Sequence, residues 1–296
     1  MKVCGDDMRI ESRSRKIFNV CNIVVLSILG LLFVVPYLMI LSASLTGEAE
    51  FLRYGYSIFP RGFTFEAYGK LFKDDMTILH ALGNSVFLTV VGTALHVMVN
   101  AFAAYPLSKK NFVGKKPVMY ILIFAMLFSG GLVPTYILIV EMGLKNTWFA
   151  LLLPGALAPW NCILIRSFYL SIPDSLEEAA KLDGASNLKI FLSIYVPVSM
   201  PVLASQVMFT AVGFWNSWSG PILYFDSRHR DMLPLTAILQ QMLQENVDPS
   251  GGAVGSGYSE TVKMATVVIS TLPIIFTYPF MQKYFISGMM LGSVKE

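Results

Sequence analysis

Residues 17–47 read IFNVCNIVVLSILGLLFVVPYLMILSASLTG and contain no charged side chain. The hydrocarbon core of a bilayer is about 30 Å thick, and a helix needs about 20 apolar residues to cross it. A cleaved signal peptide is the alternative, because basic residues precede the stretch and Ser42-Ala43-Ser44 resembles a cleavage site. The apolar core of a signal peptide is only about 7–15 residues long, so the stretch favours an uncleaved membrane helix.

Five further segments without Asp, Glu, Lys or Arg follow along the chain. They are residues 76–108, 117–140, 146–165, 190–225 and 264–282. Prolines such as Pro154 lie inside several of them, and membrane helices tolerate proline because neighbouring groups satisfy the freed backbone. Small residues at Gly92 and at Ser129-Gly130-Gly131 would allow close helix contacts. These segments predict an all-α membrane protein with six transmembrane helices.

The composition agrees with a membrane protein. The 296 residues are 55% hydrophobic and 14% charged, whereas soluble domains carry roughly 25% charged residues. The net charge is only +3, and no basic run lies among stacking aromatics, so no nucleic-acid partner is expected. Cys4, Cys21 and Cys162 lie far apart, which indicates neither a disulfide framework nor a metal site.

Basic residues indicate the orientation of the chain. The short segment 108–117 carries Lys109, Lys110, Lys115 and Lys116. With the N-terminus inside, the excess of Lys and Arg falls on the inner segments, so the positive-inside rule predicts that both termini are cytoplasmic. The loop from residue 170 to about 190 then lies in the cytoplasm between the fourth and fifth spans.

That loop contains a predicted short helix. Residues 172–186 read IPDSLEEAAKLDGAS. Asp174 or Ser175 can cap its N-terminus, a glutamate three residues on can complete a capping box, and Gly184 can end it in the left-handed conformation. A helix of about two turns is marginal alone in water, so it needs a surface on which to dock. Leu176, Ala179 and Ala180 share one face of it.

The same loop carries a family signature. Glu178-Ala179-Ala180, then Gly184, then Ile194-Tyr195-Val196-Pro197 resemble the cytoplasmic signature of bacterial binding-protein-dependent import permeases. That signature is Glu-Ala-Ala, three residues, Gly, nine residues, then Ile-x-Leu-Pro, and only Val196 departs from it. The resemblance extends over about residues 76–290, with an added first span as in permeases of the maltose-transporter type. It implies the membrane subunit of an ATP-binding-cassette (ABC) importer.

The resemblance also implies roles for single residues. In that family the loop is a coupling helix that sits in a groove of the ATPase subunit. Glu178 would then meet a basic group, Ala179 and Ala180 would permit close approach, and Gly184 would make the turn. The residues that the resemblance assigns to ATPase coupling are Glu178, Ala179, Ala180, Asp183, Gly184 and Pro197.

Two stretches resemble the carbohydrate subgroup of these permeases, namely residues 214–221 (FWNSWSGP) and the C-terminal residues 283–295. An aromatic ring shelters a sugar face while Asn and Ser bond its hydroxyls, so a sugar pathway would involve Trp215, Asn216, Trp218 and Ser219. Tryptophan as an interface anchor is the alternative. Arg228, His229 and Arg230 fit either an anionic sugar or a solvated loop.

No G-x-x-x-x-G-K-[ST] phosphate loop occurs in the sequence, so this chain is expected to bind no cofactor and to be no enzyme. ATP and Mg would bind a partner ATPase. The implied partners are a second homologous permease, two ATPase subunits, an extracytoplasmic substrate-binding protein and membrane lipid. His96 is expected to be a packed, hydrogen-bonded histidine rather than a proton relay. A membrane scaffold or sensor subunit and an intramembrane enzyme remain as alternatives.

The predicted domain organisation has three parts. Residues 1–75 hold a cytoplasmic N-terminus, the first transmembrane helix and an outer loop. Residues 76–290 form the five-helix core of a type I importer permease, and residues 291–296 are a cytoplasmic tail. The expected location is the bacterial plasma (inner) membrane. The glycine-rich tip 249–257 is either a contact for the binding protein or a mobile connector.

Overall fold

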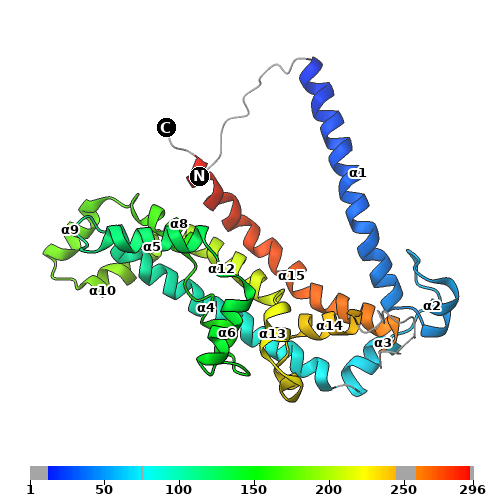
Figure 1. Cartoon of the computed structure of the whole chain (residues 1–296). Helices are drawn as coiled ribbons and strands as arrows, with labels where there is room; N and C mark the ends of the chain where they lie inside the picture. Colours follow the sequence, from blue (N-terminus) through cyan, green and yellow to red (C-terminus); the bar gives the residue numbers. More distant parts are fainter. Residues whose placement is uncertain (1–12, 75, 245–257, 294–296) are drawn as a thin grey trace. The chain divides into compact units, whose positions relative to one another are not determined.

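The computed structural model describes residues 13–74, 76–244 and 258–293 (Figure 1), and these residues are mostly helical and form no β-strand. The helices in chain order are α1 (Arg13–Ser44), α2 (Glu48–Tyr54), α3 (Glu66–Gly69), η1 (Lys70–Asp74), α4 (Met76–Ser108), α5 (Lys115–Leu127), α6 (Leu132–Glu141), α7 (Phe149–Leu152), α8 (Pro159–Tyr169), α9 (Asp174–Leu182), α10 (Asn187–Ile190), η2 (Phe191–Tyr195), α11 (Val196–Val198), α12 (Met200–Trp215), α13 (Ser219–Tyr224), η3 (Ser227–Met232), α14 (Leu235–Gln244) and α15 (Glu260–Ser293). The predicted glycine-rich tip and the last three residues of the predicted tail lie outside the described residues.

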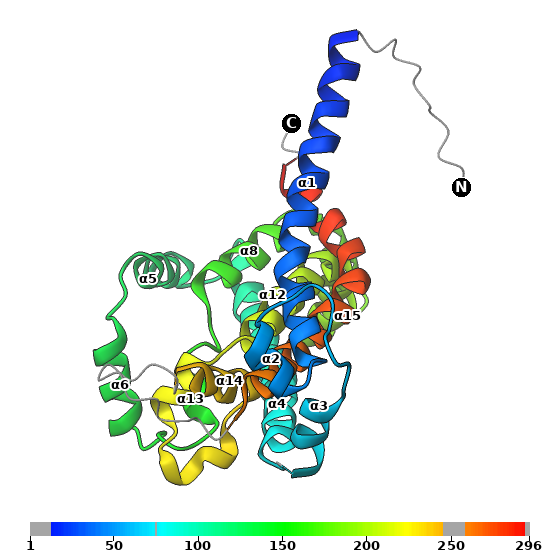
Figure 2. The ribbon, with the colours of Figure 1, turned by 90° about the vertical axis from the view of Figure 1, so that its right-hand side faces the viewer.

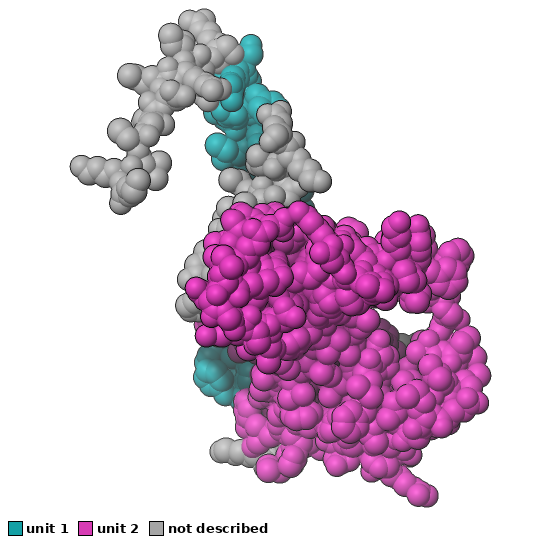
Figure 3. Space-filling model, turned by 90° about the vertical axis from the view of Figure 1, so that its left-hand side faces the viewer, with its two compact units in different colours: residues 1–70, 258–268 teal, residues 71–257, 269–296 magenta. Residues whose placement is uncertain are grey.

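The chain divides into two compact units (Figure 3). The first comprises Met1–Lys70 and Tyr258–Val268, and the second comprises Leu71–Gly257 and Ile269–Glu296. In the first unit, Ala43, Phe51 and Met264 form a small apolar core. The second unit contains every element of the predicted coupling site.

Three single helices are long and apolar enough to cross a membrane, namely Ser14–Ser44, Met76–Ser108 and Glu260–Pro279. Two bent pairs also pass this test. The chain bends by 118° between Lys115–Leu127 and Leu132–Glu141, and by 79° between Asn187–Val198 and Met200–Trp215. Figure 2 shows α5 and α6 running in different directions. The described residues thus give three to five spans by length and composition, and the count of six stays a prediction.

The segment 146–165 is not the single helix that the sequence suggested. It is divided between α7 and α8, with a break that contains Pro154 and Gly155. Two α4 side chains bond the backbone groups that the break frees. His96 Nδ1 lies 2.7 Å from Gly155 O, Asn100 Nδ2 donates to Ala156 O at 2.9 Å, and Asn100 Oδ1 accepts from the amide of Ala158 at 3.1 Å. The break persists because α4 replaces its missing helical hydrogen bonds.

His96 confirms the expectation of a packed histidine. Only 7% of it is exposed. Since a carbonyl oxygen only accepts, Nδ1 is the donor to Gly155, and Nε2 then accepts from Asn161 Nδ2 at 2.7 Å. Both ring nitrogens are therefore engaged in holding α8 and the broken segment against α4.

Helix α4 packs along α12, and the two lie side by side in Figures 1 and 2. The contact is closest at Gly92, where an added Cβ would lie 2.7 Å from the Phe214 ring. The expected close contact at Gly92 is confirmed. Ser129-Gly130-Gly131 instead lies in the break between α5 and α6, where Gly131 has φ +86°, so the helix contact expected there is wrong.

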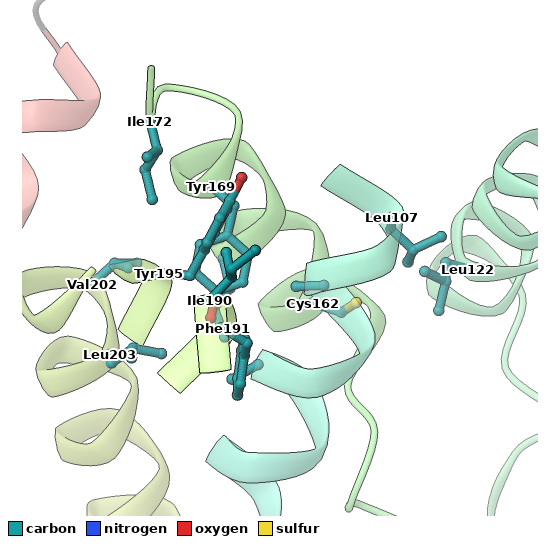
Figure 4. Close-up of a cluster of buried hydrophobic side chains, with 13 residues drawn as sticks. Leu107, Leu122, Cys162, Tyr169, Ile172, Ile190, Phe191, Tyr195, Val202 and Leu203 are labelled. Atoms are coloured by element: carbon teal, nitrogen blue, oxygen red, sulfur yellow. The ribbon is translucent and has the colours of Figure 1, made fainter. Parts of the chain in front are cut away.

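A buried cluster joins α4, α8, η2 and α12 near the C-terminal end of α4. Figure 4 shows Tyr169, Tyr195 and Phe191 gathered between these segments. The rings of Tyr169 and Tyr195 meet edge to face at 5.3 Å. This cluster supports the loop that carries α9.

We predict that Gly92→Ala destabilises the protein, because the new methyl group would overlap the Phe214 ring. Overpacking of this kind costs about 1–3 kcal/mol. Thermal unfolding of the detergent-purified protein measures the effect. Gly83→Ala on the same helix is the matched control, since nothing lies within 4 Å of its added Cβ. Equal melting temperatures for the two variants would contradict the packing.

Candidate functional site

Helix α9 is the short helix that the sequence predicted. It spans Asp174–Leu182, and Gly184 after it has φ +74°. The amide of Ala185 donates to Ala180 O at 2.9 Å and the amide of Gly184 donates to Lys181 O at 3.0 Å. This pair of bonds is a Schellman motif, which needs a left-handed residue at the glycine position. The predicted role of Gly184 in the turn is confirmed.

The capping box predicted at the start of α9 is wrong. Pro173 precedes the first helical residue, and no side chain caps the helix there. The carboxylates that could have capped it are bound elsewhere. Asp174 forms an ion pair with Lys110, and Glu177 forms one with Lys109. Acidic residues in the first turn still stabilise α9 through the helix dipole.

Glu177 lies at the centre of a polar cluster on the inner side of α9. Its carboxylate forms ion pairs with Lys109 and, at 2.7 Å, with Lys181, and it accepts a hydrogen bond from the Tyr195 hydroxyl at 2.8 Å. Only 13% of the Glu177 side chain and 22% of the Lys109 side chain are exposed. The Lys109 ammonium also lies 4.0 Å from the ring centres of both Tyr105 and Tyr195. We call Lys109, Glu177, Tyr105 and Tyr195 the lysine clamp.

The electrostatics of the lysine clamp favour the ionised carboxylate. Burial raises the pKa of Glu177, but hydrogen bonds from Lys109, Lys181 and Tyr195 outweigh it and hold that pKa at about 2. Burial lowers the pKa of Lys109 by more than the hydrogen bond to Glu177 raises it. Glu177 is therefore charged at neutral pH, and its bonds to α4 and η2 are charge-assisted.

A cavity of about 750 Å³ opens beside the lysine clamp. Its walls come from the end of α4, the segment after α8, and α9. Lys110, Asp174 and Asn187 add further polar groups to its lining. All four residues of the lysine clamp line this cavity, so water reaches the clamp.

The predicted coupling residues fall into two groups. Glu178, Ala179, Asp183 and Gly184 are exposed along α9 and its end, and Ala180 is partly buried against the core cluster. Glu178 forms no ion pair with another residue that the structure describes. Pro197 is exposed on α11, in a different segment from α9.

Sequence reasoning missed Glu177 and Lys109. Two signals were present, since the signature glutamate is preceded by a second glutamate and the segment 108–117 carries four lysines. The pattern did not reveal that the first glutamate faces inward and the second faces out. The sequence also did not indicate a partner for Arg166. In the structure, Arg166 Nε donates a hydrogen bond to Leu107 O in the last turn of α4, at 2.9 Å.

The predicted sugar-pathway residues lie at the end of α12 and the start of α13. Trp215 is 6% exposed and donates to Ser270 O at 2.8 Å, which joins α12 to α15. Asn216 follows the end of α12, Ser219 begins α13, and both are exposed. Trp218 is 42% exposed. Trp215 is thus a packing residue here, and a pathway role for the four residues stays a prediction.

Among the residues with described positions, no three His, Cys, Asp or Glu side chains lie close enough together to hold a metal ion. Asp174, Glu177 and Lys181 of α9 form ion pairs within the chain. Their arrangement suits mechanical linkage between helices.

Comparison with known families and structures gives one consistent match. Residues 97–290 match the family described as binding-protein-dependent transport system inner membrane component. Protein LplC of Bacillus subtilis is 40% identical over 289 residues, which cover 96% of this chain and 97% of LplC. The polygalacturonan/rhamnogalacturonan transport system permease protein YtcP of the same organism is 37% identical over 271 residues. The alignment covers 90% of this chain and 94% of YtcP.

A solved structure agrees with this match. The crystal structure of a bacterial ABC transporter involved in the import of the acidic polysaccharide alginate contains a chain that superposes with a TM-score of 0.83 at 32% identity. The superposition covers 93% of this chain and 99% of that chain. A chain of the bacterial alginate transporter in complex with its pentasaccharide-bound periplasmic protein shares the fold, with a TM-score of 0.58 at 15% identity.

We predict that α9 stays attached in mild acid and loosens only in strong acid. The pKa of Glu177 is depressed from 4.5 to about 2 on folding. Its stabilising contribution is therefore complete above about pH 4.5 and is lost as the pH falls towards 2. A spin label on Ser175→Cys, with Cys4 and Cys21 replaced by serine, reports the mobility of α9 by electron paramagnetic resonance.

The control for this titration is Glu177→Gln, which should give a mobile label at every pH. A label in the otherwise unchanged chain that became mobile between pH 8 and pH 6 would contradict the assignment to Glu177. Buried Cys162 should not take up the label.

Proposed function

Because the chain belongs to the family of binding-protein-dependent transport system inner membrane components, we propose that it is a permease subunit of an ATP-driven sugar importer. The observation that carries the proposal is α9, a short helix with the family's Glu-Ala-Ala and glycine spacing whose outer side has no partner among the described residues. The similar proteins include permeases for polygalacturonan/rhamnogalacturonan and for arabinooligosaccharides, which favours a sugar.

We propose that α9 docks in a groove of a separate ATPase subunit. Leu176 is 44% exposed and Leu182 is 89% exposed, and Ala179 lies between them on the exposed side. An apolar stripe of this kind gains from burial against a partner. The unpaired carboxylate of Glu178 beside it would meet a basic group of the ATPase, and ATP and Mg would bind there rather than to this chain.

Six membrane crossings with both termini in the cytoplasm fit this role in the inner membrane. The fourth crossing would be made jointly by α7 and α8 across their break. Residues 1–75 would then supply the added first span, 76–290 the five-helix core and 291–296 the tail. A second, homologous permease and two ATPases would complete the transporter, and alternating access would pass sugar from the extracytoplasmic binding protein to the cytoplasm.

The substrate class that we propose is an acidic oligosaccharide. Two proteins at 32% and 37% identity act on alginate and on polygalacturonan/rhamnogalacturonan, and alginate and galacturonan are uronic acid polymers. On η3, Arg228 forms no ion pair with a described residue, because the nearby Asp226 carboxylate is bound by His229 and Asn146. Arg228 is thus a cation available to an anionic sugar at the predicted outer side.

Co-purification tests the importer assignment. The tagged chain, extracted in mild detergent, should retain a second permease and an ATPase. Gly184→Pro should lose the ATPase and keep the second permease, because proline cannot adopt φ +74° and the end of α9 would be displaced. If the unchanged chain purified alone, the importer assignment would fail and the scaffold reading would replace it.

Uptake measurements test the substrate class. Cells that depend on this transporter should take up radiolabelled uronate oligosaccharides in preference to neutral oligosaccharides of the same length. Arg228→Gln should weaken uptake of the acidic sugar and leave any neutral uptake unchanged, because only the anion uses the charge. Equal uptake of both sugars in the unchanged transporter would overturn the acidic assignment.

A further inference from the structure

We propose that Glu177 is the positioning residue through which movement of α9 reaches the membrane helices α4 and α12. The inference rests on the proposed function, because it concerns how a displacement of α9 by an ATPase would be transmitted. It separates the roles of two adjacent glutamates. Glu178 faces outward and is free for a partner, whereas Glu177 faces inward and binds this chain.

Helix α9 has few attachments to the rest of the second unit. Ala180 packs on the buried cluster, and Asp174 pairs with Lys110. The Asp174–Lys110 pair is exposed, at 61% and 77% of the two side chains, so water competes with it. Glu177, by contrast, is 13% exposed and holds its partners under aromatic cover. The attachment of α9 therefore depends mainly on Glu177.

One carboxylate joins three segments. Lys109 directly follows the last residue of α4, and Tyr195 ends η2, which continues through α11 into α12. Both residues bond Glu177, and the Lys109 ammonium also lies over the rings of Tyr105 on α4 and Tyr195 on η2. A displacement of α9 that kept these bonds would move the end of α4 and the start of the α12 segment together.

The lysine clamp resists separation for a physical reason. Removing Glu177 from its partners would leave the partly buried Lys109 without a counter-ion, and an uncompensated buried charge is strongly unfavourable. The exposed side chains of Lys110 and Asp174 can separate and be solvated by water at little free-energy cost. The lysine clamp can therefore transmit a displacement of α9, whereas the exposed ion pair cannot.

The helices that receive the movement are themselves joined. Helix α4 packs along α12 with Gly92 against Phe214, and it bonds the α7–α8 break through His96 and Asn100. Arg166 of α8 bonds Leu107 O at the end of α4. A shift that enters at Lys109 thus reaches α4, α8 and α12, which belong to the second, fourth and fifth proposed crossings.

The test uses the whole transporter in proteoliposomes and measures ATP hydrolysed per sugar transported. Glu177→Gln should raise this ratio at least about fivefold, the lower range of measured coupling between sites, while the second permease and the ATPase still co-purify. Lys109→Met should do the same. The double variant should be no worse than either single variant, because both disrupt one interaction.

Asp174→Asn is the matched control, since it breaks the exposed ion pair of the same helix. Its ratio of ATP hydrolysed to sugar transported should stay within about twofold of the unchanged protein, because exposed pairs contribute little.

Loss of the ATPase from Glu177→Gln, or an unchanged ratio in that variant, would overturn the role of Glu177 and leave the importer function standing. If the unchanged complex lacked an ATPase or ATP-driven uptake, the proposed function and this inference would fail together.

Discussion

The structure depends on a constraint that the bilayer imposes. Each backbone polar group freed by a break in a membrane helix must find a partner within the protein, because the surrounding hydrocarbon offers none. The break between α7 and α8 frees such groups, and His96 and Asn100 of α4 bind them. Two polar side chains one turn apart on α4 thus determine where α8 begins.

Helix α4 is consequently the element on which the second unit is assembled. Its middle binds the α7–α8 break, its Gly92 face accepts Phe214 of α12, and its end binds Arg166 and Glu177. The position of α9 follows from these contacts, since α9 begins shortly after α8 ends. A helix too short to be stable alone is held in place by one carboxylate and a small apolar contact.

Sequence predicted the parts of the site that depend on local geometry. The spacing from Glu178 to Gly184 gave α9 and its left-handed end, because a glycine turn leaves a local signature. The capping box failed because the helix begins after Pro173, which has no side-chain acceptor, and Glu177 is bonded to Lys109, 68 residues earlier in the chain. Such a long-range pairing has no periodic trace in the sequence. It requires the fold to bring the end of α4 to α9.

In the membrane segments too, some features could be predicted from the local sequence and others depended on the tertiary fold. Uncharged length indicated α1, α4 and most of α15, whereas the path of residues 117–140 and 146–165 could not be read, because proline is compatible with a kinked helix and with a full break. Trp215 was proposed for a sugar pathway from its neighbours in sequence. Its indole donates a hydrogen bond to Ser270 O, and this contact between distant residues could not be predicted from the sequence.

The central claim is that α9 is the contact between this permease and an ATPase. The most direct measurement is cross-linking of the intact complex through Leu182→Cys, a position 89% exposed, after Cys4 and Cys21 are changed to serine. The account predicts a cross-link to the ATPase from Leu182→Cys and none from Phe59→Cys, which is 80% exposed in the predicted outer loop. A cross-link from Phe59→Cys alone would contradict it.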